Sequence, residues 1–215
     1  MNGIQSVINH LKQYDTNNIL SLFPQPVYNT SVSCDDSELQ LIKQQELYPV
    51  GNGSISKDNH VLDIVPRLKS EIVQQSNTFL NQLGFDFDVM ITTSWINHHK
   101  QGEWCQDHMH TNSMLSGVYF LDIPPNSGEF MFRRPGTDGT RLFSSTIRPE
   151  ITQSNHFNSE LYSIIPQTNQ LIVFPSYLTH SVSCNKMELE RWTVAFNLFP
   201  IGTIGQGLNQ LTIQS

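Results

Sequence analysis

The stretch CQDHMHTNSMLSGVYFLD, residues 105–122, decides the fold class of this sequence. Its two halves, 105–110 and 115–122, have the length of short strands, and the polar residues between them are typical of a turn. Similar runs, separated by Gly, Pro and Asn, continue on both sides. We expect further strands at 87–98, 128–133, 160–165, 170–174, 179–183 and 190–198. Many short strands of this kind indicate an antiparallel sandwich or barrel.

The first 84 residues have a different pattern, in which helices predominate. Apolar residues three and four apart predict helices, and a segment with two prolines predicts an edge strand, because proline lacks the backbone donor that a central strand needs. The predicted helices are 4–11, 37–47 and 66–83, and the predicted edge strand is 20–28. Asp35 is a suitable N-cap for the second helix, and Gly84 suits the end of the third. The third helix is expected to bury Leu68, Ile72, Phe79 and Leu83.

Helices near the N-terminus followed by strands indicate an α+β fold, mainly β, in a single domain. Within residues 1–215 we expect a support region at 1–84, a barrel at 85–200 and a tail at 201–215. The segment 135–158 has little periodicity, which predicts a long loop.

The composition disfavours several classes of protein. The chain has 215 residues, of which 14% are charged, and a formal net charge of -7 without a run of Lys or Arg, which disfavours nucleic acid as a partner. No apolar run approaches the roughly 20 residues needed to cross a membrane. The N-terminus lacks a signal-peptide pattern, and Cys34, Cys105 and Cys184 fit neither a disulfide framework nor a zinc ribbon. These features predict a cytoplasmic protein.

Three histidines form a candidate metal site. His108 and His110 are two residues apart, so on a regular strand both side chains point to one face and could bind one ion. His180, near the end of an apolar run, is the third candidate ligand. Three such ligands leave positions open for a substrate, water or dioxygen. Asp107 would point to the opposite face and is a weaker candidate, and histidines that only hydrogen-bond to loops are the alternative.

Arg191 follows His180 by eleven residues and is a candidate anion-binding residue. Alternation along 190–198 places Arg191 on one face with Thr193, Ala195 and Asn197, and leaves Trp192, Val194, Phe196 and Leu198 on the core face. A guanidinium that faces a barrel interior needs an anionic partner, and a carboxylate matches its planar fork. A small dicarboxylate would therefore suit this position. The alternative is a surface ion pair with Glu188 or Glu190.

These motifs resemble a known family. The order His-x-His, a distal histidine preceded by Phe-Pro-Ser, and Arg-x-Thr is similar to the metal and cosubstrate pattern of the Fe(II)/2-oxoglutarate-dependent dioxygenases. More closely, the sequence resembles a branch of 2-oxoglutarate oxygenases known mainly from bacterial and phage sequences. The motifs that carry the likeness are 94–97, 108–110, 116–120, 174–180 and 190–197.

The resemblance implies a double-stranded β-helix, a jelly-roll and cupin-like barrel, with the N-terminal helices packed on one sheet. It also implies an oxidoreductase in which Fe(II), 2-oxoglutarate and dioxygen oxidise an unidentified substrate while 2-oxoglutarate loses carbon dioxide. The iron ligands would be His108, His110 and His180. The far carboxylate of 2-oxoglutarate would bind Arg191 and Thr193, with Asn97, Tyr119 and Asn197 as further polar groups of the pocket.

His110 departs from the family pattern, because most relatives have a carboxylate at this position. A third neutral imidazole leaves the metal more positively charged, so Zn, Ni or Cu are also credible occupants. Two other functions remain open at this stage. A cupin-like metalloenzyme would use the three histidines without 2-oxoglutarate, and a non-catalytic jelly-roll module would bind no transition metal. The 20–28 strand and the first helix also leave a homodimer open.

Overall fold

The computed structural model describes residues 19–135 and 149–214. They form a mostly β structure with few helices, which confirms the predicted fold class at this level. In chain order the elements are β1 (Tyr28–Ser31), α2 (Asp36–Lys43), β2 (Leu47–Val50), β3 (Gly53–Ser56), η1 (Val61–Ile64), α3 (Pro66–Gln82), β4 (Asp88–His99), β5 (Cys105–His108), β6 (Leu115–Asp122), β7 (Phe130–Arg133), β8 (Leu161–Ile164), β9 (Gln170–Pro175), β10 (His180–Val182), β11 (Arg191–Ile204), η2 (Gly207–Asn209) and β12 (Leu211–Ile213).

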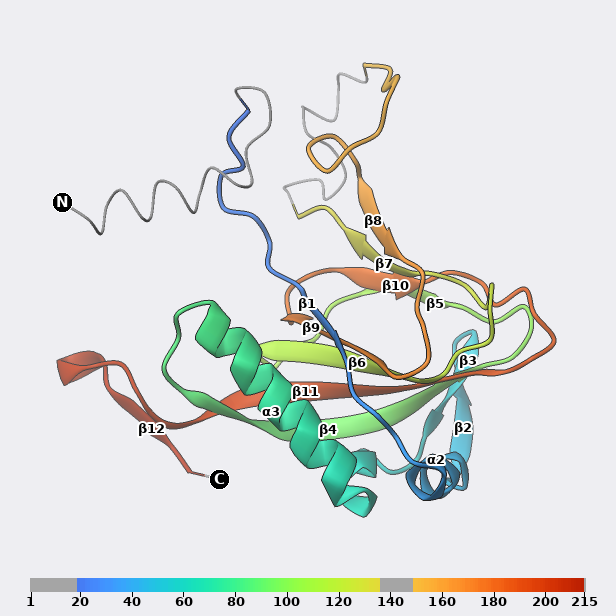
Figure 1. Ribbon diagram of the computed structural model, residues 1–215, viewed down its shortest axis with the longest axis horizontal. Coiled ribbons are helices and arrows are strands. Elements are labelled where there is room, and N and C mark those ends of the chain that lie inside the picture. The colour runs from blue at the N-terminus through green and yellow to red at the C-terminus, as the bar shows by residue number, and fades with distance from the viewer. Residues whose placement is uncertain (1–18, 136–148, 215) are drawn as a thin grey trace.

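The strands form two sheets, which Figure 1 shows one above the other. The larger sheet has the order β1-β9-β6-β11-β4-β3-β2, with β12 paired to the end of β11. The smaller sheet has the order β5-β10-β7-β8. The pairings of the long central strands β4, β6, β9 and β11 are antiparallel, as expected for a sandwich or barrel.

The helix α3 lies across one face of the larger sheet (Figure 1). Pro66 begins this helix and Gly84, with a φ of 82°, follows its end, as predicted. Leu83 is an exception to the predicted apolar stripe, because the helix ends at Gln82 and leaves Leu83 41% exposed. The core between α3 and the sheet contains Leu68, Ile72 and Phe79 from the helix and Ile96, Val194, Phe196 and Leu198 from the strands. The predicted core face of 190–198 is thus confirmed for these three β11 residues.

The other face of the larger sheet packs against the smaller sheet through aromatic side chains. Phe120 of β6 contacts Phe130 of β7 at 5.9 Å between ring centroids, and Phe174 of β9 contacts Phe132 of β7 at 5.0 Å. Val118 and Ile172 belong to the same apolar cluster. The candidate site lies between these two sheets as well, with residues from both of them.

The helix α2 begins with a reciprocal cap. The carboxylate of Asp35 accepts a hydrogen bond from the backbone N–H of Glu38, and the Glu38 carboxylate accepts one from the backbone N–H of Asp35. The helix ends at Lys43, four residues before the predicted end, because the chain turns there into a hairpin of β2 and β3. Gly51 adopts a φ of 57° in the turn of this hairpin, a conformation that glycine accepts without strain.

Other boundaries also differ from the sequence prediction. The edge strand is not 20–28 but β1, which begins at Tyr28, because Pro24 and Pro26 precede the first residues that can pair with β9. Beyond the predicted strand 190–198, β11 continues to Ile204, and the chain returns as β12. The predicted helix 4–11 and most of the predicted loop 135–158 lie outside the described residues.

Within the described residues, the structure contains no helix that combines the length and the apolar character required to cross a membrane.

Candidate metal centre

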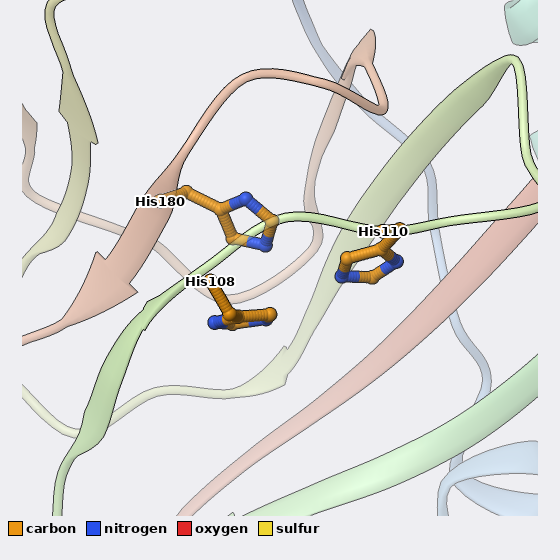
Figure 2. Close-up of side chains that lie close together, drawn as sticks. All are labelled: His108, His110 and His180. Carbon is orange, nitrogen blue, oxygen red and sulfur yellow. The ribbon is translucent and has the colours of Figure 1, made fainter. Parts of the chain in front are cut away.

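Three imidazoles, two from neighbouring strands of the smaller sheet and one from the segment just after β5, converge on one point (Figure 2). His108 is the last residue of β5, His110 lies just beyond it, and His180 is the first residue of β10, where it pairs with His108. Candidate ligand atoms of the three side chains all lie within 4.8 Å of one another. The expected regular strand through His110 is wrong, since β5 ends at His108, but the chain still brings both imidazoles to one side.

Each imidazole of the triad has its Nδ1 atom next to an oxygen that can only accept a hydrogen bond. Nδ1 of His108 lies 2.9 Å from the carbonyl oxygen of Gln106, and Nδ1 of His180 lies 2.9 Å from that of Leu178. Nδ1 of His110 lies 2.6 Å from the amide oxygen of Asn197. The proton of each neutral ring is therefore on Nδ1, and the lone pair of Nε2 is free for a metal ion.

Asn197 is held by three partners, so its amide orientation is defined. Its oxygen accepts hydrogen bonds from His110 and from the hydroxyl of Ser116 at 2.9 Å, while its nitrogen donates to the hydroxyl of Thr93 at 3.1 Å. Ser116 in turn lies 2.8 Å from the hydroxyl of Ser176. This network places Asn197 behind a candidate ligand, a position that the alternation of β11 does not reveal.

His180 lies in the driest part of the triad. Its side chain is 4% exposed and is surrounded by rings of Phe130, Phe132 and Phe174, with centroids 4.8 to 6.3 Å away. Burial, reinforced by the neighbouring His108, lowers the pKa of His180 to about 3. Burial also lowers the pKa of His110, against the hydrogen bond to Asn197. Both rings are therefore neutral at pH 7, as metal binding requires.

Arg191 is buried, and no ion pair links it to another of the described residues. Its side chain is 1% exposed, and its three guanidinium nitrogens have no hydrogen-bond partner among residues 19–135 and 149–214. The guanidinium carbon lies 5.7 Å from the centroid of the Phe120 ring. Burial lowers the pKa of Arg191 to about 10. The alternative of a surface ion pair is wrong, because Glu190 instead lies 3.0 Å from Nε2 of His98. A buried, unpaired guanidinium is a ready site for an anion.

Of the other predicted site residues, some lie on the same face of the larger sheet as Arg191 and some do not. Thr193 pairs with Asn97 in the register of β11 and β4, so both lie on the same face as Arg191. Tyr119 lies on the opposite face, where its hydroxyl hydrogen-bonds to the amide oxygen of Asn169 at 2.7 Å. Asp107 points away from the triad and pairs with Arg133.

Two residues of β4 near the site were not singled out from the sequence. Trp95 packs against His110 with ring centroids 5.4 Å apart, and His99 pairs in register with Arg191. Alternation along β4 could have found them, because it places Trp95, Asn97 and His99 on one face. Cys105 of β5 also lies near the site, with its sulfur 3.7 Å from Nδ1 of His108.

The sequence around the site and the fold are similar to those of known proteins. Residues 93–197 match a family model described as "Putative 2OG-Fe(II) oxygenase". None of the curated proteins matches the sequence. A 2OG-Fe(II) oxygenase family oxidoreductase from Burkholderia pseudomallei superposes with a TM-score of 0.57 at 16% identity, over 80% of this chain and 83% of the other.

Two further solved structures have the same fold. The non-heme alpha ketoglutarate dependent epimerase SnoN from nogalamycin biosynthesis gives a TM-score of 0.57 at 11% identity, covering 90% of this chain and 83% of its own. HygX from Streptomyces hygroscopicus gives a TM-score of 0.52 at 9% identity, and the match covers 82% of this chain and 83% of HygX. The family match contains all three triad histidines and Arg191. The site-bearing segment 93–197 is therefore similar in sequence to the family described as "Putative 2OG-Fe(II) oxygenase".

Proposed function

We propose that this protein is an Fe(II)- and 2-oxoglutarate-dependent oxygenase that uses dioxygen to oxidise a second, unidentified substrate. One observation carries the proposal: a histidine triad with free Nε2 atoms and a buried, unpaired Arg191 occupy the space between the same two sheets. A metal ion needs the first group, and the far carboxylate of a dicarboxylate needs the second.

The finer fold assignment is part of this proposal. A larger sheet centred on β4, β6, β9 and β11 and a smaller sheet of β5, β7, β8 and β10 support a double-stranded β-helix. In such a barrel the ends of β5, β9 and β10 form the mouth. The predicted division into a support region, a barrel and a tail, and the predicted homodimer, stay predictions.

The three imidazoles would hold the iron through Nε2. The fit rests on the fixed tautomers, because each Nδ1 proton is already donated to an oxygen. A set of three neutral nitrogen ligands also suits Zn, Ni and Cu, so the metal present in the cell is decided by availability as well as affinity. HygX has been solved with nickel and 2-oxoglutarate bound, and SnoN in complex with Fe3+ and alpha ketoglutarate, which supports this class of ligand here.

Arg191 would bind the far carboxylate of 2-oxoglutarate, with Thr193 beside it and Asn97 on the neighbouring strand. The buried guanidinium keeps its charge at pH 7, since its pKa is still about 10. An anion at this position would supply the acceptors that all three nitrogens lack. For Tyr119 we propose a structural role instead, because its hydroxyl is bonded on the far side of the sheet.

The protein contributes orientation and a dry environment. Bound iron and 2-oxoglutarate together supply the oxidising power, with dioxygen consumed and carbon dioxide and succinate released. Asn197 orients the ring of His110, and the phenylalanines around His180 exclude water from that side of the site. Arg191 fixes the direction in which the cosubstrate lies.

An anaerobic titration tests the proposal. Metal-free protein is titrated with Fe(II) and then with 2-oxoglutarate, and both binding steps are followed by calorimetry and visible absorbance. We expect one Fe(II) per chain, followed by 2-oxoglutarate binding that requires the metal. His108→Ala and His180→Ala should abolish metal binding, whereas the exposed His60→Ala should not.

The two alternative functions predict different results. A cupin-like enzyme would bind the metal but not 2-oxoglutarate, and Arg191→Ala would then have no effect on ligand binding. A non-catalytic jelly-roll module would bind no metal with defined stoichiometry. Either result would overturn the proposed function.

A further inference from the structure

His99 occupies a defined place beside Arg191. It is the last residue of β4, and its backbone pairs directly with Arg191 of β11. Cross-strand partners in an antiparallel pair point to the same face, so both side chains enter the space between the sheets. The preceding residue, His98, points to the opposite face, where its ring lies 4.1 Å from that of Trp192.

The neighbouring strand leaves room for the imidazole of His99. A Cβ atom at Gly53 of β3 would lie 2.9 Å from Cδ2 of His99, closer than side chains tolerate. The absence of a side chain at Gly53 therefore lets the ring pack against β3. The ring is only 5% exposed in this position.

The buried imidazole has an unsatisfied polar atom. Nδ1 of His99 is inaccessible to solvent and, like the three nitrogens of Arg191, has no hydrogen-bond partner in the described part of the chain. Leaving a buried polar group unpaired is unfavourable. Two such groups on paired residues of the same face are best explained by one ligand that serves both.

The charge of the pair also indicates the ligand. Burial, followed by the nearby charge of Arg191 and by His98, lowers the pKa of His99 to about 4. The imidazole is therefore neutral at pH 7 and can donate one hydrogen bond without adding a second positive charge. One guanidinium with one neutral donor matches a single carboxylate better than it matches a phosphate with two charges.

We infer that His99 is a second binding residue for the far carboxylate of 2-oxoglutarate, donating from Nδ1 to one oxygen while Arg191 pairs with the carboxylate. The inference rests on the proposed function. It makes His99 a specificity residue that distinguishes 2-oxo acids with a far carboxylate from those without one.

The test compares two ligands in three variants. Binding of 2-oxoglutarate and of 2-oxovalerate, which lacks the far carboxylate, is measured by calorimetry on anaerobic, Fe(II)-loaded protein. His99→Leu removes the donor, His99→Asn keeps an N–H near the position of Nδ1, and His98→Leu is the matched control on the other face. Stoichiometric Fe(II) binding and thermal unfolding verify that each variant is folded and metal-competent.

We expect His99→Leu to weaken 2-oxoglutarate binding about tenfold or more and to leave 2-oxovalerate binding unchanged. His99→Asn should recover part of the loss, and His98→Leu should bind both ligands like the wild type. Equal 2-oxoglutarate affinity in His99→Leu and wild type would overturn the role of His99 while the proposed function stands. If the wild type binds Fe(II) but not 2-oxoglutarate, the proposed function itself fails, and the inference fails with it. If His99→Leu does not fold, His99→Asn and Gly53→Ala, which displaces the ring, decide the question by the same two-ligand comparison.

Discussion

The amide oxygen of Asn197 lies 2.6 Å from Nδ1 of His110, so a strand of the larger sheet orients a candidate ligand carried by the smaller one. The contact is with a neutral amide and not a carboxylate. The amide oxygen fixes the tautomer of His110, while burial, acting against this hydrogen bond, lowers the pKa of the ring.

Replacing Asn197 by Leu should weaken Ni(II) binding about 10- to 100-fold, the usual effect of losing a partner behind a metal-bound histidine. Asn197→Asp keeps an acceptor at the same place and should bind the metal at least as tightly as the wild type. Calorimetric titration of both variants with Ni(II) measures the effect. Wild-type affinity in Asn197→Leu would show that Asn197 has no influence on the metal site.

Arg191→Met should make the ligand-free protein more stable. The native guanidinium is buried and unpaired, and a buried charge without a partner is less favourable than an apolar side chain of similar size. We expect a gain of about 1 to 2 kcal/mol in the free energy of unfolding by urea. The same variant should lose at least about a hundredfold in 2-oxoglutarate affinity.

Arg133→Met is the control for that experiment, because Arg133 pairs with Asp107 near the surface and should contribute little to stability. If Arg191→Met instead destabilises the ligand-free protein, Arg191 has a partner in the apo state and is not an open anion site.

Stability should fall as the pH is lowered from 7 toward 4, in part because of His99. An unfolded histidine has a pKa of about 6.5, whereas the pKa of folded His99 is about 4. Between these values the unfolded chain binds a proton that the folded protein does not, so acid favours unfolding by up to about 3 kcal/mol. Urea unfolding of wild type and His99→Asn at pH 7, 6 and 5 should show that the free energy of unfolding falls less in the variant. If the free energy of unfolding depends on pH in the same way in both proteins, the pKa of His99 is not depressed.

Gly117→Ala should destabilise the protein by about 1 to 3 kcal/mol, because the core has no space for another methyl group there. A Cβ atom at Gly117 of β6 would lie 2.2 Å from Cζ of the buried Phe196 on β11. The double variant Gly117→Ala/Phe196→Leu should lose less stability than the sum of the losses in the two single variants. Thermal unfolding of the four proteins gives the coupling, and strict additivity would contradict this packing.

Most of the fold could be predicted from the sequence where local signals are strong. The boundaries of β6 and the start of α3 at Pro66 follow directly from an apolar run and a helix-starting proline. The hairpin of β2 and β3 could not, because its residues 47–56 are dominated by turn formers, and it is stabilised by pairing with β4. Tertiary pairing of this kind leaves little trace in local sequence.

In the candidate site, too, local patterns could be predicted from the sequence and contacts between strands could not. The triad and Arg191 could be predicted because their residue types and spacing are unusual. The separation of Tyr119 from the site could also have been found, since alternation in β6 places it beside Gly117 on the helix-covered face. Alternation along β4 places His99 on the site face, but the pairing of His99 with Arg191 and the hydrogen bond between His110 and Asn197 join different parts of the chain, and no pattern within one strand predicts such contacts.

Gly53 belongs to a hairpin outside the segment 93–197 that matches the family model, yet it forms the surface against which His99 lies. A fragment trimmed to the matched segment would keep every residue of the triad and Arg191 but would open the buried end of the site to water. Transfer of this site to another scaffold would therefore have to include the β2–β3 hairpin. The part of the chain that encloses the site is thus larger than the segment that the family model matches.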